Sequence, residues 1–167
     1  MSQKTQENLM AAFAGESQAN RKYLAFAQKA DKEGKAKTAR LFRAVAEAET
    51  IHALKHLETA SKVGSTMDNV KEAIEGETYE FSNMYPEFIE KAKEEGEAKA
   101  TKSFELANEA EKVHADLYKK ALAALEAGGD MQAESFHLCP VCGYVALDQA
   151  PERCPICNAP AKTFKPY

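Results

Sequence analysis

The sequence has no long apolar run, no excess of basic residues and no cysteine before position 139. No stretch approaches 18 consecutive apolar residues, so we expect no membrane-spanning helix and no membrane partner. The 22 Lys and Arg stand against 26 Asp and Glu, with both signs interleaved, which argues against binding of nucleic acid. The first residues, MSQKTQENLM, contain no apolar segment of an export signal, so we expect a cytoplasmic protein.

Proline and glycine are scarce over residues 4–126, which are rich in Ala, Glu, Lys and Leu. This composition is typical of helices. Pro86 should kink one of them, because proline lacks a backbone donor and clashes with the preceding turn. Breaks at glycines predict four helices, over residues 5–33, 36–63, 67–95 and 97–127. The predicted fold class is therefore mainly α, with these helices forming a four-helix bundle.

One face of each predicted helix carries carboxylates near its middle, between apolar residues at helical spacing. Ionised carboxylates in a bundle core are costly unless positive charge compensates them, and these faces offer too few Lys or Arg side chains to do so. Two bound metal ions would supply the charge, and carboxylate oxygens with a few imidazole nitrogens suit iron or manganese. The candidate ligands are Glu16, Glu49, His52, Glu77, Glu80, Glu111 and His114.

An internal repeat supports the two-metal hypothesis. The segments VAEAETIH at 45–52 and ANEAEKVH at 107–114 share E-A-E-x-x-H at an offset of 62, and Gly15-Glu16 matches Gly76-Glu77 at an offset of 61. A lone inward glutamate is usually a solvated rim residue. Two Glu-x-x-His motifs with a glutamate on each of two further helices form a known di-metal arrangement of ferritin-like bundles. The repeat predicts two similar helix hairpins, in which Glu80 has no counterpart because it aligns with Ala19.

The C-terminal segment has a different character. Residues 128–135, GGDMQAES, read as a linker between a bundle domain at 1–127 and a small domain at 136–167. A domain this short needs a metal to stabilise it, and paired thiols in a reducing cytosol are typical metal ligands. Iron and zinc both fit four thiolates, so a zinc ribbon is the alternative. The two C-P-x-C motifs contain Cys139, Cys142, Cys154 and Cys157, each pair followed by a residue that should have positive φ, Gly143 or Asn158.

Over essentially its full length the sequence resembles the rubrerythrins, in which a ferritin-like di-iron bundle precedes a rubredoxin-like domain. The resemblance is carried by AGESQANRKY, EAETIH, GETYEFSNMYPEF, EAEKVH, CPVCGY and CPICNAP. It implies two non-haem irons in the bundle and one iron held by the four cysteines. It further implies bridging carboxylates at Glu49 and Glu111, terminal ligands at Glu16, Glu77 and His114, and an exchange of Glu80 with His52 at one iron as the redox state changes. Tyr23 and Tyr85 match family tyrosines near the site, although plain core packing is an equal interpretation.

The resemblance also implies a function. We expect a peroxidase that reduces hydrogen peroxide to water in oxidative-stress defence, with electrons passing through the four-cysteine iron from a rubredoxin or an NAD(P)H-dependent reductase. The alternatives are a ferroxidase that handles iron and a non-enzymatic metal-binding protein with a zinc ribbon. The linker looks too short to bring the small domain close to the site on its own chain. We therefore expect a head-to-tail homodimer or a higher homo-oligomer.

Overall fold

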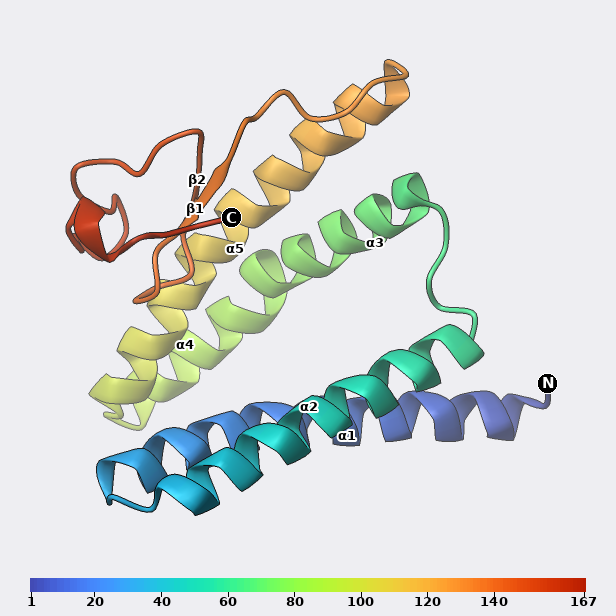
Figure 1. Ribbon diagram of the computed structural model, residues 1–167. Coiled ribbons are helices and arrows are strands. Elements are labelled where there is room, and N and C mark those ends of the chain that lie inside the picture. The colour runs from blue at the N-terminus through green and yellow to red at the C-terminus, as the bar shows by residue number, and fades with distance from the viewer. The chain divides into compact units, whose positions relative to one another are not determined.

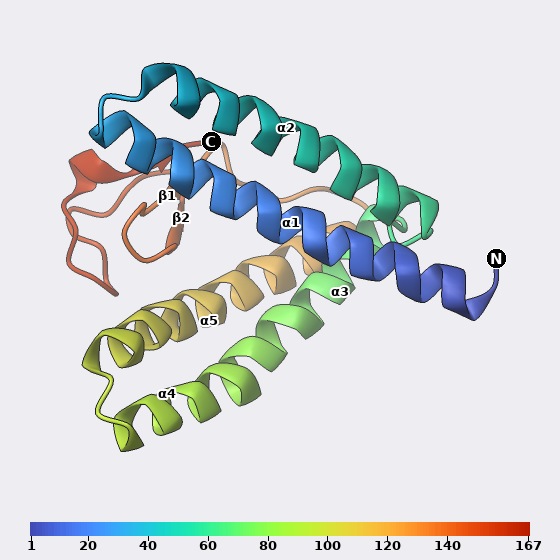
Figure 2. The ribbon, with the colours of Figure 1, turned by 90° about the horizontal axis from the view of Figure 1, so that it is seen from below.

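The computed structural model describes residues 1–167, which divide into two compact units, Met1–Gly64 and Ser65–Tyr167 (Figures 1 and 2). The chain is mainly helical and ends in a small strand region with four cysteines, which confirms the predicted fold class. No helix is long and apolar enough to span a membrane. The boundary between the units lies inside the predicted bundle domain 1–127, so that division into domains stays a prediction.

The first unit is a hairpin of α1 (Gln3–Lys32) and α2 (Ala36–Thr59), which lie side by side in Figure 1. The Ser2 hydroxyl caps the start of α1 by accepting a hydrogen bond from the Thr5 amide. Gly34, with φ of +72°, turns the chain between the helices. Small side chains form the seam between them, which lets the two backbones approach closely. The buried seam residues are Ala27, Ala30, Ala39, Ala46 and Ala53.

The end of α2 differs from the prediction. The sequence places it at residue 63 before Gly64, whereas α2 ends at Thr59 and the chain reverses at Ser61, with φ of +54°. Amides of residues 61 and 62 donate to carbonyl oxygens of residues 58 and 57, the hydrogen-bond pattern that closes a helix around a left-handed residue. Ser65 instead begins the next helix, where it forms a capping box with Asp68.

The second unit opens with a helix in three parts, α3 (Thr66–Tyr79), the π-helical segment η1 (Glu80–Met84) and α4 (Tyr85–Glu94), packed against α5 (Ala98–Glu126). The sequence predicts one helix here with a kink at Pro86. Instead, the Tyr85 amide donates to the Glu80 carbonyl across a π turn directly before Pro86. Pro86 thus sits in the first turn of α4, where its missing donor costs little.

The π turn accommodates one extra residue relative to α1. Glu16 matches Glu77 at an offset of 61, but Tyr23 matches Tyr85 and Phe26 matches Phe88 at 62. In a regular helix a residue eight positions further on lies about 80° around the axis, so Tyr85 would leave the face of Glu77. A π turn absorbs the additional residue. Glu77 and Tyr85 therefore stay on one face of their helix, as Glu16 and Tyr23 do on α1.

Each helix pair contains an aromatic trio and an ion pair at matching positions of the repeat. Tyr23, Phe26 and Phe42 form an aromatic trio with ring centroids 5.6–6.2 Å apart, and the matching Tyr85, Phe88 and Phe104 form another at 5.6–6.4 Å. Each pair also has an ion pair between its helices, with the signs exchanged. The ion pairs are Asp31 with Arg43 and, at an offset of 62, Lys93 with Glu105. The repeat in the sequence is therefore also a repeat in structure, with one copy in each unit.

The small domain follows α5 and forms a three-stranded antiparallel sheet in the order β2-β1-β3. Its strands are β1 (Phe136–Leu138), β2 (Val145–Leu147) and β3 (Lys165–Pro166), with a 3-10 turn, η2, at Ala161–Thr163. Phe136 and Tyr167 exchange backbone hydrogen bonds of 3.0 and 2.8 Å and tie the C-terminus to the start of the sheet. These contacts hold the two cysteine loops at one end of the sheet.

Candidate metal centres

The α1–α2 hairpin brings together three of the predicted ligands. One ligand atom each from Glu16, Glu49 and His52 lies within 4.8 Å of the others. The Nδ1 atom of His52 is 3.1 Å from Oε2 of Glu49, one helix turn away. The Asn20 side chain donates to the Ala46 carbonyl at 2.7 Å and the Thr50 hydroxyl at 2.8 Å. This amide therefore fixes α1 against α2 beside the three ligands.

The second unit brings together the matching three ligands, Glu77, Glu111 and His114, again within 4.8 Å. The His114 Nδ1 atom is 2.6 Å from Glu111 and 3.6 Å from Glu77. Each unit therefore contains one half of the predicted ligand set, and we call the two groups the α1–α2 half-site and the α3–α5 half-site.

The groups of the α3–α5 half-site have shifted pKa values, because two carboxylates and an imidazole lie close together and are partly buried. Burial, together with a hydrogen bond to Glu111, raises the pKa of Glu77 to about 7. The hydrogen bond to Glu111 raises the pKa of His114 to about 9 and holds the pKa of Glu111 below its usual range. The carboxylates of Glu77 and Glu111 thus favour positive charge beside Nδ1 of His114. A metal ion bound by these carboxylate oxygens would provide that charge. The donor set of carboxylate oxygens and imidazole nitrogens fits iron.

Glu80 lies at the margin of this half-site. It is not one of the three ligands within 4.8 Å, but burial and the Glu111 carboxylate raise its pKa. Burial, followed by the same carboxylates, also raises the pKa of Tyr85, which places this phenol beside the acidic group. Glu80 is the first residue of the π turn, where the backbone departs from regular helix. The extra residue in the repeat was the sequence signal that could have revealed this turn.

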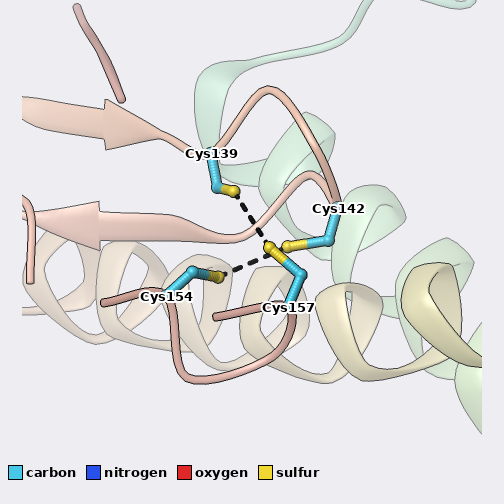
Figure 3. Close-up of side chains that lie close together, drawn as sticks. All are labelled: Cys139, Cys142, Cys154 and Cys157. Atoms are coloured by element: carbon cyan, nitrogen blue, oxygen red, sulfur yellow. Dashed lines mark hydrogen bonds between the residues drawn. The ribbon is translucent and has the colours of Figure 1, made fainter. Parts of the chain in front are cut away.

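The four cysteine side chains converge at one end of the small domain (Figure 3). Sulfur atoms of Cys139 and Cys157 are 3.5 Å apart, as are those of Cys142 and Cys154, and all four cysteines are free thiols. These spacings leave room for one central ion held by four thiolates. Burial of the sulfurs excludes water from the centre, because three of the four residues are buried.

Backbone amides of both cysteine loops point at the sulfurs. Amides of Val141 and Cys142 donate to the Cys139 sulfur and hold its pKa below the usual range despite burial. Gly143 and Asn158 have φ of +85° and +64°, which confirms the conformation predicted for the residue after each pair. The left-handed turn at each position directs the following amide towards sulfur, and the amides of Tyr144 and Ala159 donate in this way.

The small domain packs directly on α5 of its own chain. The Gly143 carbonyl accepts a hydrogen bond of 2.9 Å from Nε2 of His114, and a Cβ on Gly143 would lie 3.8 Å from the Ala110 side chain. The expectation that the linker keeps this domain away from its own site is therefore wrong for the α3–α5 half-site. Only about 18 Å of helix separates Glu126 from His114. An extended linker covers this distance.

The two histidines differ in their hydrogen bonds and in their exposure. His114 is 24% exposed and both its ring nitrogens are engaged, by Glu111 and by the Gly143 carbonyl. His52 is 57% exposed and its only hydrogen bond is to Glu49. No local sequence pattern indicates the contact of Gly143 with His114, because the two residues belong to different elements 29 positions apart.

Comparisons with known proteins agree with this description. A family model described as "Rubrerythrin" matches residues 7–122, and one described as "Rubrerythrin, rubredoxin-like domain" matches residues 137–165. Nigerythrin of Nitratidesulfovibrio vulgaris is 44% identical over 98% of this chain and 86% of its own length. Rubrerythrin-2 of Clostridium acetobutylicum is 34% identical over 98% of this chain and 96% of its own.

Solved structures lead to the same family. Nigerythrin in a partially reduced state and in a fully reduced, all-ferrous state each give a TM-score of 0.59 at 42% identity, covering 98% of this chain and 86% of theirs. The cofactors of such a chain are two irons at a carboxylate and histidine site and one iron at the four cysteines, and its role is that of an iron-dependent oxidoreductase in oxidative stress. Because these two family models together span almost the whole sequence, this chain belongs to the rubrerythrin family.

Proposed function

We propose that this protein is a peroxidase that reduces hydrogen peroxide to two waters, taking up two electrons and two protons per turnover. Its di-iron site would use Glu16, Glu49, His52, Glu77, Glu80, Glu111 and His114, and its single iron would use the four cysteines. When bound, the two irons supply the electrons and the Lewis acidity for cleavage of the O–O bond. The four-cysteine iron would be refilled one electron at a time by a rubredoxin or an NAD(P)H-dependent reductase.

The observation that carries the proposal is the hydrogen bond between His114 and the Gly143 carbonyl. Gly143 follows Cys142 directly in the chain, so a short path of bonds joins a ligand of the single iron to a ligand of the di-iron site. The same bond fixes the His114 tautomer, because Nε2 carries the donated proton and Nδ1 faces Glu111 and Glu77. A storage protein has no need of an electron relay at its iron ligand, which favours peroxidase over ferroxidase.

The exposure of His52 supports the exchange of ligands expected at one iron. His52 is held by Glu49 alone, so its ring can reorient when the charge of the site changes. Glu80 is a partly buried carboxylate whose pKa burial raises, so it is stabilised as an anion only when the site carries enough positive charge. We propose that Glu80 binds in the oxidised state and His52 in the reduced state.

Compartment and assembly belong to the same proposal. Four free cysteines arranged as metal ligands favour a reducing environment, so we place the protein in the cytoplasm. We also propose that it is a homodimer or a higher homo-oligomer.

The experiment is to compare peroxide consumption driven by reduced rubredoxin with oxygen-driven oxidation of Fe(II). We expect rubredoxin-dependent consumption of hydrogen peroxide to be the faster reaction. A Cys142→Ser variant is the matched control. It should lose rubredoxin-driven turnover but still react once with peroxide after chemical reduction of the di-iron site. Rapid oxidation of Fe(II) by oxygen without rubredoxin-dependent peroxide consumption would identify the protein as a ferroxidase instead.

A further inference from the structure

A partly buried asparagine links the two helices of the first unit beside their ligands. The Asn20 amide nitrogen donates to the Ala46 carbonyl at 2.7 Å and to the Thr50 hydroxyl at 2.8 Å. Asn20 lies one helix turn after Glu16, and Thr50 directly follows Glu49. The residues that join α1 to α2 are therefore neighbours of the candidate ligands on both helices.

The two partners of this amide fix its orientation. A carbonyl oxygen can only accept a hydrogen bond, so the amide nitrogen of Asn20 must face Ala46. The Thr50 hydroxyl directs its own hydrogen towards the same carbonyl, at 3.3 Å, and accepts from Asn20 with its oxygen. Turning the amide over would place its oxygen against the Ala46 oxygen. Because Ala46 is only 1% exposed, water competes little for these hydrogen bonds.

Such a link restrains the helices and not only their side chains. The Ala46 carbonyl belongs to the backbone of α2, and Thr50 adds a second contact one turn further along the same helix. Ligand atoms of Glu16, Glu49 and His52 lie within 4.8 Å of one another. Because metal–ligand distances in a well-formed site vary by only about 0.2 Å, a small shift of α1 against α2 would alter how these side chains bind an ion.

The second unit holds its matching ligands by other contacts. Asn20 matches Phe81 at the offset of 61 or Ser82 at the offset of 62, and Ala46 matches Asn108. The Ser82 hydroxyl donates to a carbonyl of its own helix, and the Asn108 amide oxygen is buried without a hydrogen-bond partner. The amide link between the helices is therefore specific to the α1–α2 half-site.

This half-site also contains the less constrained of the two histidines. His52 is 57% exposed and is hydrogen-bonded to Glu49 alone, and the proposed function has it replace Glu80 as the redox state changes. An ion stays bound during such an exchange when its other ligands keep their places. Glu16 and Glu49 therefore need a restraint that does not depend on the ion, and the Asn20 amide supplies one.

We propose that Asn20 is a positioning residue of the di-iron site. Its amide keeps Glu16 and Glu49 in place, so that the movement of ligands in the α1–α2 half-site is confined to His52. Asn20 acts through the two helices that it joins and contacts neither the ions nor the substrate. This inference rests on the ligands and the ligand exchange of the proposed function, and it does not depend on which substrate the site reduces.

The test is iron release from an Asn20→Leu variant, in which a side chain of similar size replaces the amide. Iron-loaded protein is mixed with a chelator, and release is followed in the oxidised and in the reduced state. We expect the di-iron site to lose iron about tenfold faster than in wild type in both states, because groups behind metal ligands contribute about 10–100-fold to metal affinity. The four-cysteine iron should be released as in wild type.

Ser17→Ala is the matched control. Ser17 lies beside Glu16, but its hydroxyl donates to the Phe13 carbonyl of the same helix at 2.6 Å, so iron release should not change. Thr50→Val removes one of the two acceptors of Asn20 and should accelerate release by less than Asn20→Leu does. The double variant should release iron no faster than Asn20→Leu alone, because Thr50 acts through the same amide.

Four results would contradict the role of Asn20. They are equal acceleration in Ser17→Ala, additive effects of Asn20→Leu and Thr50→Val, a lowered melting temperature of Asn20→Leu with unchanged iron release, and unchanged iron release in Thr50→Val. The last variant keeps the bond of Asn20 to Ala46, so it tests the inference even where Asn20→Leu does not fold. Wild-type protein that binds three irons per chain but does not reduce peroxide would contradict the proposed function alone.

Discussion

At the residue scale, one carbonyl group gives two side chains of the same type different hydrogen bonds. His52 and His114 occupy matching positions of the repeat, and the sequence predicted both as ligands from their Glu-x-x-His spacing. This spacing is local, so helix geometry alone brings each histidine to its glutamate. The Gly143 carbonyl, which only tertiary contact brings to His114, engages the second nitrogen of that imidazole, whereas His52 is hydrogen-bonded to Glu49 alone.

Residues after the cysteine pairs offer a matched pair of substitutions. Gly143→Ala places a side chain at φ of +85°, where a left-handed conformation costs about 1–2 kcal/mol, and adds a methyl group against Ala110. We expect faster loss of the four-cysteine iron on heating. Asn158→Gly removes the smaller cost that asparagine has at φ of +64° and should slow iron loss or leave it unchanged. Equal iron loss in both variants would contradict this explanation.

Glu80 should matter in one oxidation state more than in the other. Removing its carboxylate takes a negative charge from a site that holds two ferric ions, whereas the ferrous site has less positive charge to neutralise. We expect Glu80→Ala to lose iron to a chelator faster than wild type when oxidised and at a similar rate when reduced. The measurement is iron release in each state, and equal acceleration in both would contradict the assignment of Glu80 to the oxidised site.

At the element scale, helix periodicity predicted the four helical segments but not how they end or where they change form. The end of α2 at Ser61 escaped prediction because serine adopts positive φ only when the surrounding hydrogen bonds require it. The π turn was visible in the sequence only as a change of offset from 61 to 62, which has meaning once α1 and α3 are compared. These local departures set the length of the connection and the position of Glu80.

Deleting one residue from η1 tests whether the π turn results from one extra residue relative to α1. Removal of Ser82, an exposed residue of the π turn, should restore a regular helix with Glu77 and Tyr85 still on one face. We expect a folded protein whose melting temperature changes by only a few degrees. Removal of the exposed Gln18 in α1 is the control. It rotates one half of that helix by about 100° relative to the other and should prevent folding. A deletion of Ser82 as damaging as that of Gln18 would contradict the insertion.

At the scale of the whole molecule, the chain consists of two helix pairs, each with half of the candidate ligands, and a small domain that packs on α5. Ala110 is 2% exposed beneath the cysteine loop. Its counterpart in the repeat, at an offset of 62, is Ala48 on α2. Within the second unit, the contact at Ala110 joins the cysteine loop to the helix that carries Glu111 and His114.

Enlarging the residue under the cysteine loop should uncouple the two iron sites. Ala110→Leu overpacks the contact at a cost of about 1–3 kcal/mol, so the small domain should dock less often and rubredoxin-driven turnover should fall about tenfold. The iron content and the single reaction with peroxide after chemical reduction should be unchanged. Ala48→Leu is the matched control and should keep its turnover. Loss of turnover in both variants would contradict a specific role for the docked domain.

The sequence by itself determined the helical class, the two groups of candidate ligands, the four-cysteine domain and its positive-φ turns. These features depend on residues at most a few positions apart, whose geometry the period of a helix or the shape of a turn fixes. Tertiary structure alone decided that α2 ends early, that a π turn absorbs the extra residue and that the Gly143 carbonyl engages His114. The end of α2 and the π turn depend on backbone hydrogen bonds that no residue type there dictates, and the His114 contact depends on packing between residues 29 positions apart.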